Sequence, residues 1–236
     1  MRAFPICAFA AAALATPASA AVNLVPNGDF EGGNADFTSA YTYSPGGNNA
    51  EGQYTVRTDP NPWNPFFLSV ADHTDGGGQM MFVGNGSPTV GQVVWQSTPI
   101  VIANSTSYFF EAFVMNVCCN TGYGGGNSDP LLTFSVSLDG GPLQSLATLG
   151  IPANQAGVWH GLSSNFNSGT ATSAVLSLVN ANTIAAGNDF AVDDIFLGTE
   201  SIVNPVPEPS TWAMMLLGFG LLGGALRRRG RLLAAA

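Results

Sequence analysis

The sequence predicts an all-β domain, built as an antiparallel sandwich or barrel, and three observations support this prediction. Between residues 21 and 204, short segments alternate apolar and polar residues, turn-forming residues separate them, and helix-forming residues are scarce. The clearest alternation is LTFSVSL at 132–138, where every second residue is apolar and serine or threonine stands between. Many short strands separated by turns are typical of antiparallel sandwiches and barrels.

Taken in chain order, strands are expected at 79–83, 91–96, 106–117, 132–138, 158–166, 173–180 and 190–197. The longest, 106–117, is rich in aromatic and β-branched residues and is predicted to be a central strand. Residues 34–64 and 72–78 are rich in glycine, asparagine, aspartate and proline, so both are expected to be long loops. Loops of that length on a β scaffold are either functional or simply tolerated.

The first twenty residues predict a secretory signal peptide with a helical apolar run. Arg2 supplies the positive charge, the run extends from Phe4 to Leu14, and TPASA ends the segment. Cleavage is expected after Ala20, because small residues follow a helix-breaking proline there. The β domain is then assigned to 21–204 and a separate C-terminal segment to 205–231.

The C-terminal segment has three parts: VPEPST at 206–211, an apolar run at 212–226 and a basic tail at 227–231. As a helix, the run from 212 to 226 is about 22 Å long. A bilayer core needs around 20 residues, so the run is predicted to be a marginal transmembrane helix. Arginines beyond the run predict a cytoplasmic C-terminus, with the domain on the other side of the membrane.

Charge is distributed unevenly along the chain. The chain has 15 acidic and 6 basic residues, and Arg57 is the only basic residue between 21 and 204. A surface this acidic repels phosphate backbones, which excludes nucleic acid as a partner. It is compatible with cation binding, with neutral glycans, or with solubility alone.

The chain contains two adjacent cysteines, Cys118 and Cys119, besides Cys7 in the predicted signal. Thiols of exported proteins usually pair, yet neighbouring Cα atoms lie about 3.8 Å apart, below the usual separation in a disulfide. Three states therefore stay open: a disulfide between the neighbours, two free thiols, or bridges to another chain. The spacing matches no metal-binding cysteine pattern.

We find no catalytic motif in the sequence, and the chain is predicted not to be an enzyme. His73 and His160 are the only histidines and are interpreted as a loop residue and a strand residue. The sequence has neither GxSxG nor HExxH, and no pair stands out among its carboxylates.

Glycan binding is easier to support, since sugars contact exposed aromatic rings that have polar neighbours. Aromatic residues in the expected loops are the candidates: Tyr41, Tyr43, Trp63 and Tyr123. Packing in the core is the alternative for each ring.

The two ends of the β domain carry a resemblance. NLVPNGDFE at 23–31 and DFAVDDIFL at 189–197 resemble the first and last strands of jelly-roll domains of the galactose-binding and carbohydrate-binding-module type. The resemblance implies a jelly-roll sandwich whose first and last strands lie side by side. It also implies a structural calcium, which oxygen ligands suit, and the matching positions are Asp29 or Glu31 with Asp193 or Asp194. Alternatively, Asp193 and Asp194 end a strand and face solvent.

The C-terminal segment resembles the PEP-CTERM sorting signal of exported proteins in Gram-negative bacteria. The resemblance implies that an exosortase in the membrane recognises and processes the segment. The residues it assigns are the motif and the basic stop: Pro207, Glu208 and Pro209, and Arg227, Arg228 and Arg229. It also implies export through the inner membrane to the cell surface or the extracellular matrix.

The expected function is a non-catalytic role in an exopolysaccharide or biofilm matrix, with glycan binding as one part of it. One alternative is a structural surface protein without glycan affinity. Another is a hydrolase that acts on the matrix polymer.

Overall fold

The computed structural model describes residues 21–48, 50–74, 81–119 and 128–204, together with 215, 218–221 and 223. The chain divides into two compact units, 21–205 and the two ends 1–20 with 206–236. In the second unit the described residues are helical, and no described helix is long and apolar enough to cross a membrane. The predicted signal peptide, sorting motif and basic tail lie outside the described residues.

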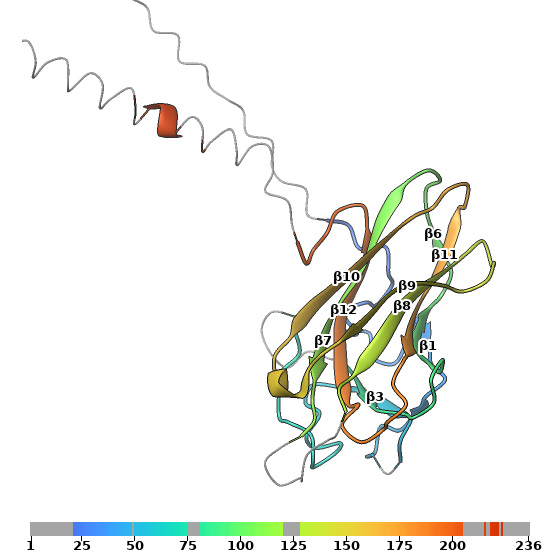
Figure 1. Cartoon of the computed structure of the whole chain (residues 1–236), viewed down its shortest axis with the longest axis vertical. Coiled ribbons are helices and arrows are strands. Elements are labelled where there is room, and N and C mark those ends of the chain that lie inside the picture. Colours follow the sequence, from blue (N-terminus) through green and yellow to red (C-terminus); the bar gives the residue numbers. More distant parts are fainter. Residues whose placement is uncertain are drawn as a thin grey trace, which may run out of the picture. The chain divides into compact units, whose positions relative to one another are not determined.

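The unit 21–205 is a sandwich of two sheets, shown in Figure 1. Sheet A has the order β1-β5-β11-β8-β9, with β6 also paired to β11, and its strands are β1 (Phe37–Thr38), β5 (Val93–Ser97), β6 (Ile100–Val101), β8 (Leu131–Leu138), β9 (Gln144–Gly150) and β11 (Ser173–Asn180). Sheet B has the order β10-β7-β12-β4-β3-β2, formed by β2 (Thr42–Tyr43), β3 (Gln53–Arg57), β4 (Met81–Asn85), β7 (Ser107–Asn116), β10 (His160–Asn167) and β12 (Phe190–Gly198). The pairs are antiparallel except β2 with β3, and one 3₁₀ turn, Ala153–Gln155, precedes β10.

The predicted all-β jelly-roll sandwich is confirmed. Each expected strand corresponds to an observed one, and the longest, β7, lies between β10 and β12 in sheet B. The N-terminal segment lies against the last strand, because Leu24 donates a backbone hydrogen bond to the carbonyl of Leu197 at 2.8 Å. Gly28 is required there, since a Cβ at this position would lie 2.1 Å from the carbonyl oxygen of Ile195.

The expected loop at 34–64 is partly wrong, because it contains β1, β2 and β3. The buried apolar side chains of the domain form two clusters. The main cluster fills the space between the sheets, with Phe30, Phe82, Trp95, Phe110, Phe134 and Phe190 among its fully buried side chains. The second cluster lies on the outer face of sheet B and consists of Trp63, Phe67, Met81, Val83, Met115, Val117 and Ala191. Because side chains alternate along a strand, Met81 and Val83 face this second cluster while Phe82 faces the main one.

Candidate functional site

The aromatic residues expected to contact glycan lie in different environments. Trp63 is 2% exposed and donates a hydrogen bond from Nε1 to the carbonyl of Ser44 at 2.6 Å. Tyr41 is 3% exposed and packs near Phe190. Exposed positions for these two rings are therefore a wrong prediction, because both belong to buried clusters. Tyr43 is 41% exposed with its ring 5.3 Å from that of Tyr54, and Tyr123 lies outside the described residues.

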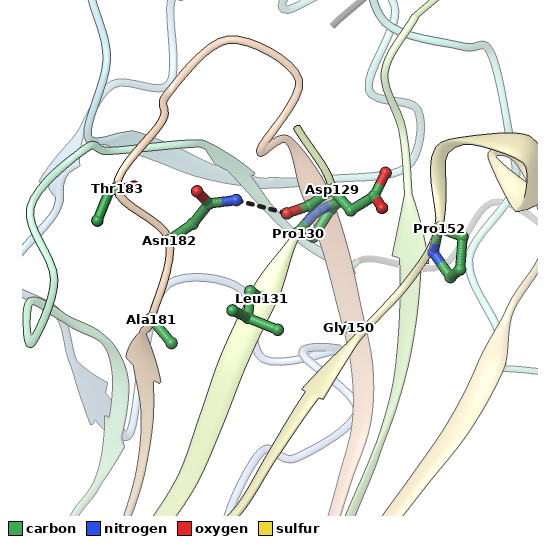
Figure 2. Close-up of a pocket in the computed structure, with 8 residues that line it drawn as sticks. All are labelled: Asp129, Pro130, Leu131, Gly150, Pro152, Ala181, Asn182 and Thr183. Carbon is green, nitrogen blue, oxygen red and sulfur yellow. Dashed lines mark hydrogen bonds between the residues drawn. The ribbon is translucent and has the colours of Figure 1, made fainter. Parts of the chain in front are cut away.

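An open depression of about 480 Å³ lies at one end of sheet A, where β8 begins and β9 and β11 end. Figure 2 shows its lining residues: Asp129, Pro130, Leu131, Gly150, Pro152, Ala181, Asn182 and Thr183. The two prolines, the leucine and the alanine provide apolar surface beside a carboxylate, an amide and a hydroxyl. This mixture of apolar surface with a few polar groups is typical of sites for small polar ligands.

The wall of the depression is held by Asn182. Its Nδ2 donates to the carbonyl of Asp129 at 2.6 Å (Figure 2), and also to the hydroxyl of Ser128. Its Oδ1 accepts the backbone N–H of Ile184 at 2.9 Å. Asn182 therefore joins the chain after β11 to the chain before β8 and keeps the depression open.

A β-bulge in β12 places two carboxylates beside the segment around His73. The register shifts between Asp193 and Phe196, and Asp194 has a φ of 46°. The fully buried Asp193 accepts the backbone N–H of His73 at 2.9 Å, and Asp194 contacts Nδ1 of His73 at 2.6 Å. The His73 ring stacks on Phe113 with 3.5 Å between centroids. Burial, and then the charge of Asp194, raise the pKa of Asp193 to about 7.

The four carboxylates expected at a calcium site lie in different environments. Asp29 and Glu31 are exposed, whereas the oxygens of Asp193 and Asp194 accept hydrogen bonds from the segment at His73 and Thr74. In the part of the chain that the structure describes, no three of the four have ligand atoms within 4.8 Å of one another.

Asp72 is a buried carboxylate that the sequence analysis did not include. Both of its side-chain oxygens are buried, and no other residue in the described part of the chain donates a hydrogen bond to them; the backbone N–H of Asp72 itself is the one donor beside the carboxylate. Burial first, and then the charges of Glu31 and Asp194, raise its pKa. No local sequence signal identifies it, because its neighbour His73 is brought to β12 by a contact with the distant Asp194.

Cys118 and Cys119 are joined by a disulfide. Their sulfurs lie close to the carboxylate of Asp189, and the ligand atoms of the three residues are all within 4.8 Å of one another. His160 is a half-buried strand residue of β10, as interpreted from the sequence.

A fourth buried carboxylate, Glu111 on β7, holds the end of the domain. Its Oε1 accepts hydrogen bonds from the hydroxyls of Ser163 and Ser201 at 2.5 and 2.6 Å. Its Oε2 accepts the backbone N–H groups of Ile202 and Val203 at 2.6 and 3.2 Å. Glu111 is fully buried, and these four hydrogen bonds replace those that its carboxylate would otherwise make with water.

Comparisons with known proteins agree with the C-terminal assignment. Residues 205–229 match the family model described as the PEP-CTERM protein-sorting motif. The sorting signal is thereby shown for this segment, which begins one residue after the predicted β domain ends. No curated protein matches the chain.

Several solved structures are similar to the chain. The enzymatically active domain of tailspike protein 4 from bacteriophage CBA120 has a TM-score of 0.45 at 16% identity, over 75% of this chain and 21% of that one. The Family 16 Carbohydrate Binding Module-2 has a TM-score of 0.43 at 15% identity, over 74% and 99%. TmCBM61, in complex with β-1,4-galactotriose, has a TM-score of 0.44 at 14% identity, over 76% and 99%. Similarity at this level assigns neither a ligand nor an activity to this chain.

Proposed function

We propose that this chain is an exported, non-catalytic protein that an exosortase system delivers to the surface or extracellular matrix of a Gram-negative bacterium. The match of residues 205–229 to the sorting motif carries this proposal. At its destination the acidic β-sandwich associates with exopolysaccharide in a biofilm matrix. The absence of lysine from the whole chain supports a neutral rather than an anionic polymer as its partner.

The depression at the end of sheet A is the proposed glycan contact. Its apolar residues offer surface to the C–H faces of a sugar, and Asp129 and Thr183 offer polar atoms to hydroxyl groups. The rings of Tyr43 and Tyr123 are further candidates, the first because it is exposed. A shallow site of this kind favours contact with a repeating polymer, where many weak contacts add up.

Binding is tested by co-sedimentation of the full chain with the producer's own polysaccharide. We expect Thr183→Arg, which fills the depression, to reduce binding, and Tyr43→Ala and Tyr123→Ala to test the rings. Thr170→Arg is the matched control, because Thr170 is an exposed residue just before β11 whereas Thr183 follows it. An unaltered chain that does not co-sediment contradicts glycan binding, and turnover of the polymer contradicts the non-catalytic role.

Sorting is tested separately by the mass of the chain recovered from the cell surface. We expect a product that has lost both the signal peptide and the end of the C-terminal segment. Replacing Glu208 by alanine in the motif is expected to leave the segment attached. An intact C-terminus in the unaltered chain contradicts exosortase processing without bearing on glycan binding.

A structural calcium remains part of the proposal, with Asp29 or Glu31 and Asp193 or Asp194 as ligands and Asp72 as a further one, since the charges of Glu31 and Asp194 act on it. A buried carboxylate that accepts no hydrogen bond from another residue is stabilised by a bound cation. We expect a chelator to lower the melting temperature of the unaltered chain and to leave that of Asp72→Asn unchanged. An unchanged melting temperature in the unaltered chain contradicts a calcium site.

A further inference from the structure

The pairing of β7 with β12 brings together Asp189 and the two cysteines, which are about seventy positions apart in the sequence. Phe190 is opposite Asn116, so the residues that follow β7 meet the residue that precedes β12. The backbone N–H of Val117 donates to the carbonyl of Asp189 at 3.1 Å, which fixes the two segments side by side. The proximity of Cys118, Cys119 and Asp189 is therefore part of the sheet.

The environment of this cluster is mostly buried. Cys118 and Asp189 are each 6% exposed, and Cys119 is half-buried. One oxygen of Asp189, Oδ1, accepts the backbone N–H of Gly86 at 3.0 Å. The carboxylate is thus held in place, while the half-buried Cys119 leaves an approach from solvent.

We propose that reduction of the Cys118–Cys119 disulfide forms a binding site for a thiophilic divalent cation, with the two thiolates and the Asp189 carboxylate as its ligands. In the described part of the chain, these three residues are the one group of His, Cys, Asp or Glu side chains with at least three ligand atoms within 4.8 Å of one another. Two sulfurs and one oxygen, with a fourth position left for water, suit Zn²⁺ or Cd²⁺.

An external dithiol serves as the reductant of the Cys118–Cys119 disulfide. Its thiolates attack the disulfide in two exchange steps, the bond between the two sulfurs breaks, and the dithiol itself is oxidised to a disulfide. Two electrons and two protons thereby pass to the cysteines. The cation then binds as these two protons leave, since thiolates rather than thiols are the metal ligands.

The carboxylate is suited to this role. Asp189 is 6% exposed, and the backbone N–H of Gly86 holds its Oδ1 in place. A bound cation supplies the positive charge that the buried carboxylate otherwise lacks. Because the thiols must lose their protons before they bind, affinity is expected to rise with pH.

The test is a Cd²⁺ titration of the full chain, in a mild detergent, after reduction with a dithiol and removal of the reductant under nitrogen. Cys7 is replaced by serine in every sample, so that only the two adjacent cysteines contribute sulfur. We expect one Cd²⁺ per chain, with the ultraviolet absorption of cadmium–thiolate bonds, and no such absorption before reduction. Asp189→Asn retains the acceptor for Gly86 and is expected to bind at least about tenfold more weakly. Asp36→Asn changes the same charge at an exposed position and is the matched control.

Three results would overturn the proposal. The first is a reduced chain that takes up no Cd²⁺. The second is equal affinity in Asp189→Asn and the unaltered chain, which would mean that the dithiol binds alone. The third is loss of the near-ultraviolet circular dichroism of the fold on reduction, because the site requires β7 and β12 to stay paired. Cys118→Ser and Cys119→Ser, which leave a single thiol, are expected to lose the absorption.

Discussion

The outer faces of the two sheets differ in what lies on them. On sheet B, the second cluster and the buried carboxylates Glu111 and Asp193 lie beneath other parts of the chain. On sheet A, outward positions of β8 and β11 include short polar side chains, namely Thr133, Ser135, Ser137 and Ser177, and two of these, Ser135 and Ser177, are fully buried. These bond to their neighbours within the sheet, as Gln96 does to Ser177 at 2.9 Å.

This difference shows that composition alone is a poor guide to surface charge. Acidic residues were expected to make an acidic surface, yet four of them are less than a tenth exposed: Asp72, Glu111, Asp189 and Asp193. Glu111 and Asp193 act as anchors for segments that cross the outer face of sheet B. The covered face of sheet B therefore serves stability.

The largest effect should come from the aromatic centre of the covered face. We expect Trp63→Ala to lower the free energy of unfolding by about 3–5 kcal/mol, because the ring is buried against Phe67 and its indole N–H has a partner. Urea unfolding measures this loss, and Tyr43→Ala is the control for an exposed ring. A loss below about 1 kcal/mol would mean that the segment around Trp63 does not support the fold.

The buried carboxylates predict how stability depends on pH. The pKa values of Asp189 and Asp193 are raised to about 7 in the folded chain, chiefly by burial. The folded state therefore binds protons more tightly than the unfolded state, and the resulting stabilisation is complete below pH 4 and lost as the pH rises through 7. We expect the free energy of unfolding to fall by on the order of 3 kcal/mol for each of the two carboxylates between pH 4.5 and 8.

Urea unfolding across this pH range provides the measurement, and Asp189→Asn should flatten the curve. This variant keeps an oxygen for the Gly86 N–H, so its fold is expected to persist. Stability that rises with pH in the unaltered chain would be inconsistent with buried carboxylates that are protonated in the fold.

A smaller effect is expected at the end of the domain. Glu111→Gln replaces one acceptor oxygen with an amide group, which then faces the N–H donors of Ile202 and Val203. We expect a loss of about 1–3 kcal/mol and faster hydrogen exchange at these two amides. Ser163→Ala, which removes one donor from β10 only, should leave the exchange of both amides unchanged. Unaltered exchange in Glu111→Gln would show that the segment is held by other contacts.

The smallest effect is expected at an exposed pair of threonines on the outer face of sheet A. Thr133 and Thr148 face each other across β8 and β9 with 2.8 Å between their hydroxyl oxygens. Such cross-strand pairs contribute about 0.2–1 kcal/mol, so Thr133→Ala should lower stability by no more than that. If Thr133→Ala lowered the free energy of unfolding as much as Trp63→Ala does, the outer faces of the two sheets would not differ in their contribution to stability.

The strands were predictable where burial and alternation agree. Residues 132–138 alternate because one side of β8 faces the main cluster, and the segment 106–117 is apolar because β7 is covered on both sides. β9 was not predicted, since an edge strand with exposed positions shows no clear alternation. Trp63 was misjudged for a related reason, because turn-forming residues around it give no sign that the segment covers a sheet.

The candidate sites were less predictable, because each depends on contacts between distant segments. The resemblance placed the last strand beside the N-terminal segment correctly, as Leu24 and Leu197 show. Nothing in the local sequence indicates that His73 contacts Asp194, or that Asp189 lies next to the two cysteines. These contacts follow from strand register, which becomes visible only in the folded chain.

The hydrogen bonds to Glu111 also limit how far the sorting motif can extend from the folded domain. Val203 is the last residue that they hold, and the match to the sorting motif begins at Pro205. An extended chain advances about 3.5 Å per residue, so four residues of chain after Val203 span at most about 14 Å. An enzyme that binds the motif must therefore accommodate the folded β-sandwich next to its active site. Otherwise, the hydrogen bonds between residues 201–203 and Glu111 must break before cleavage.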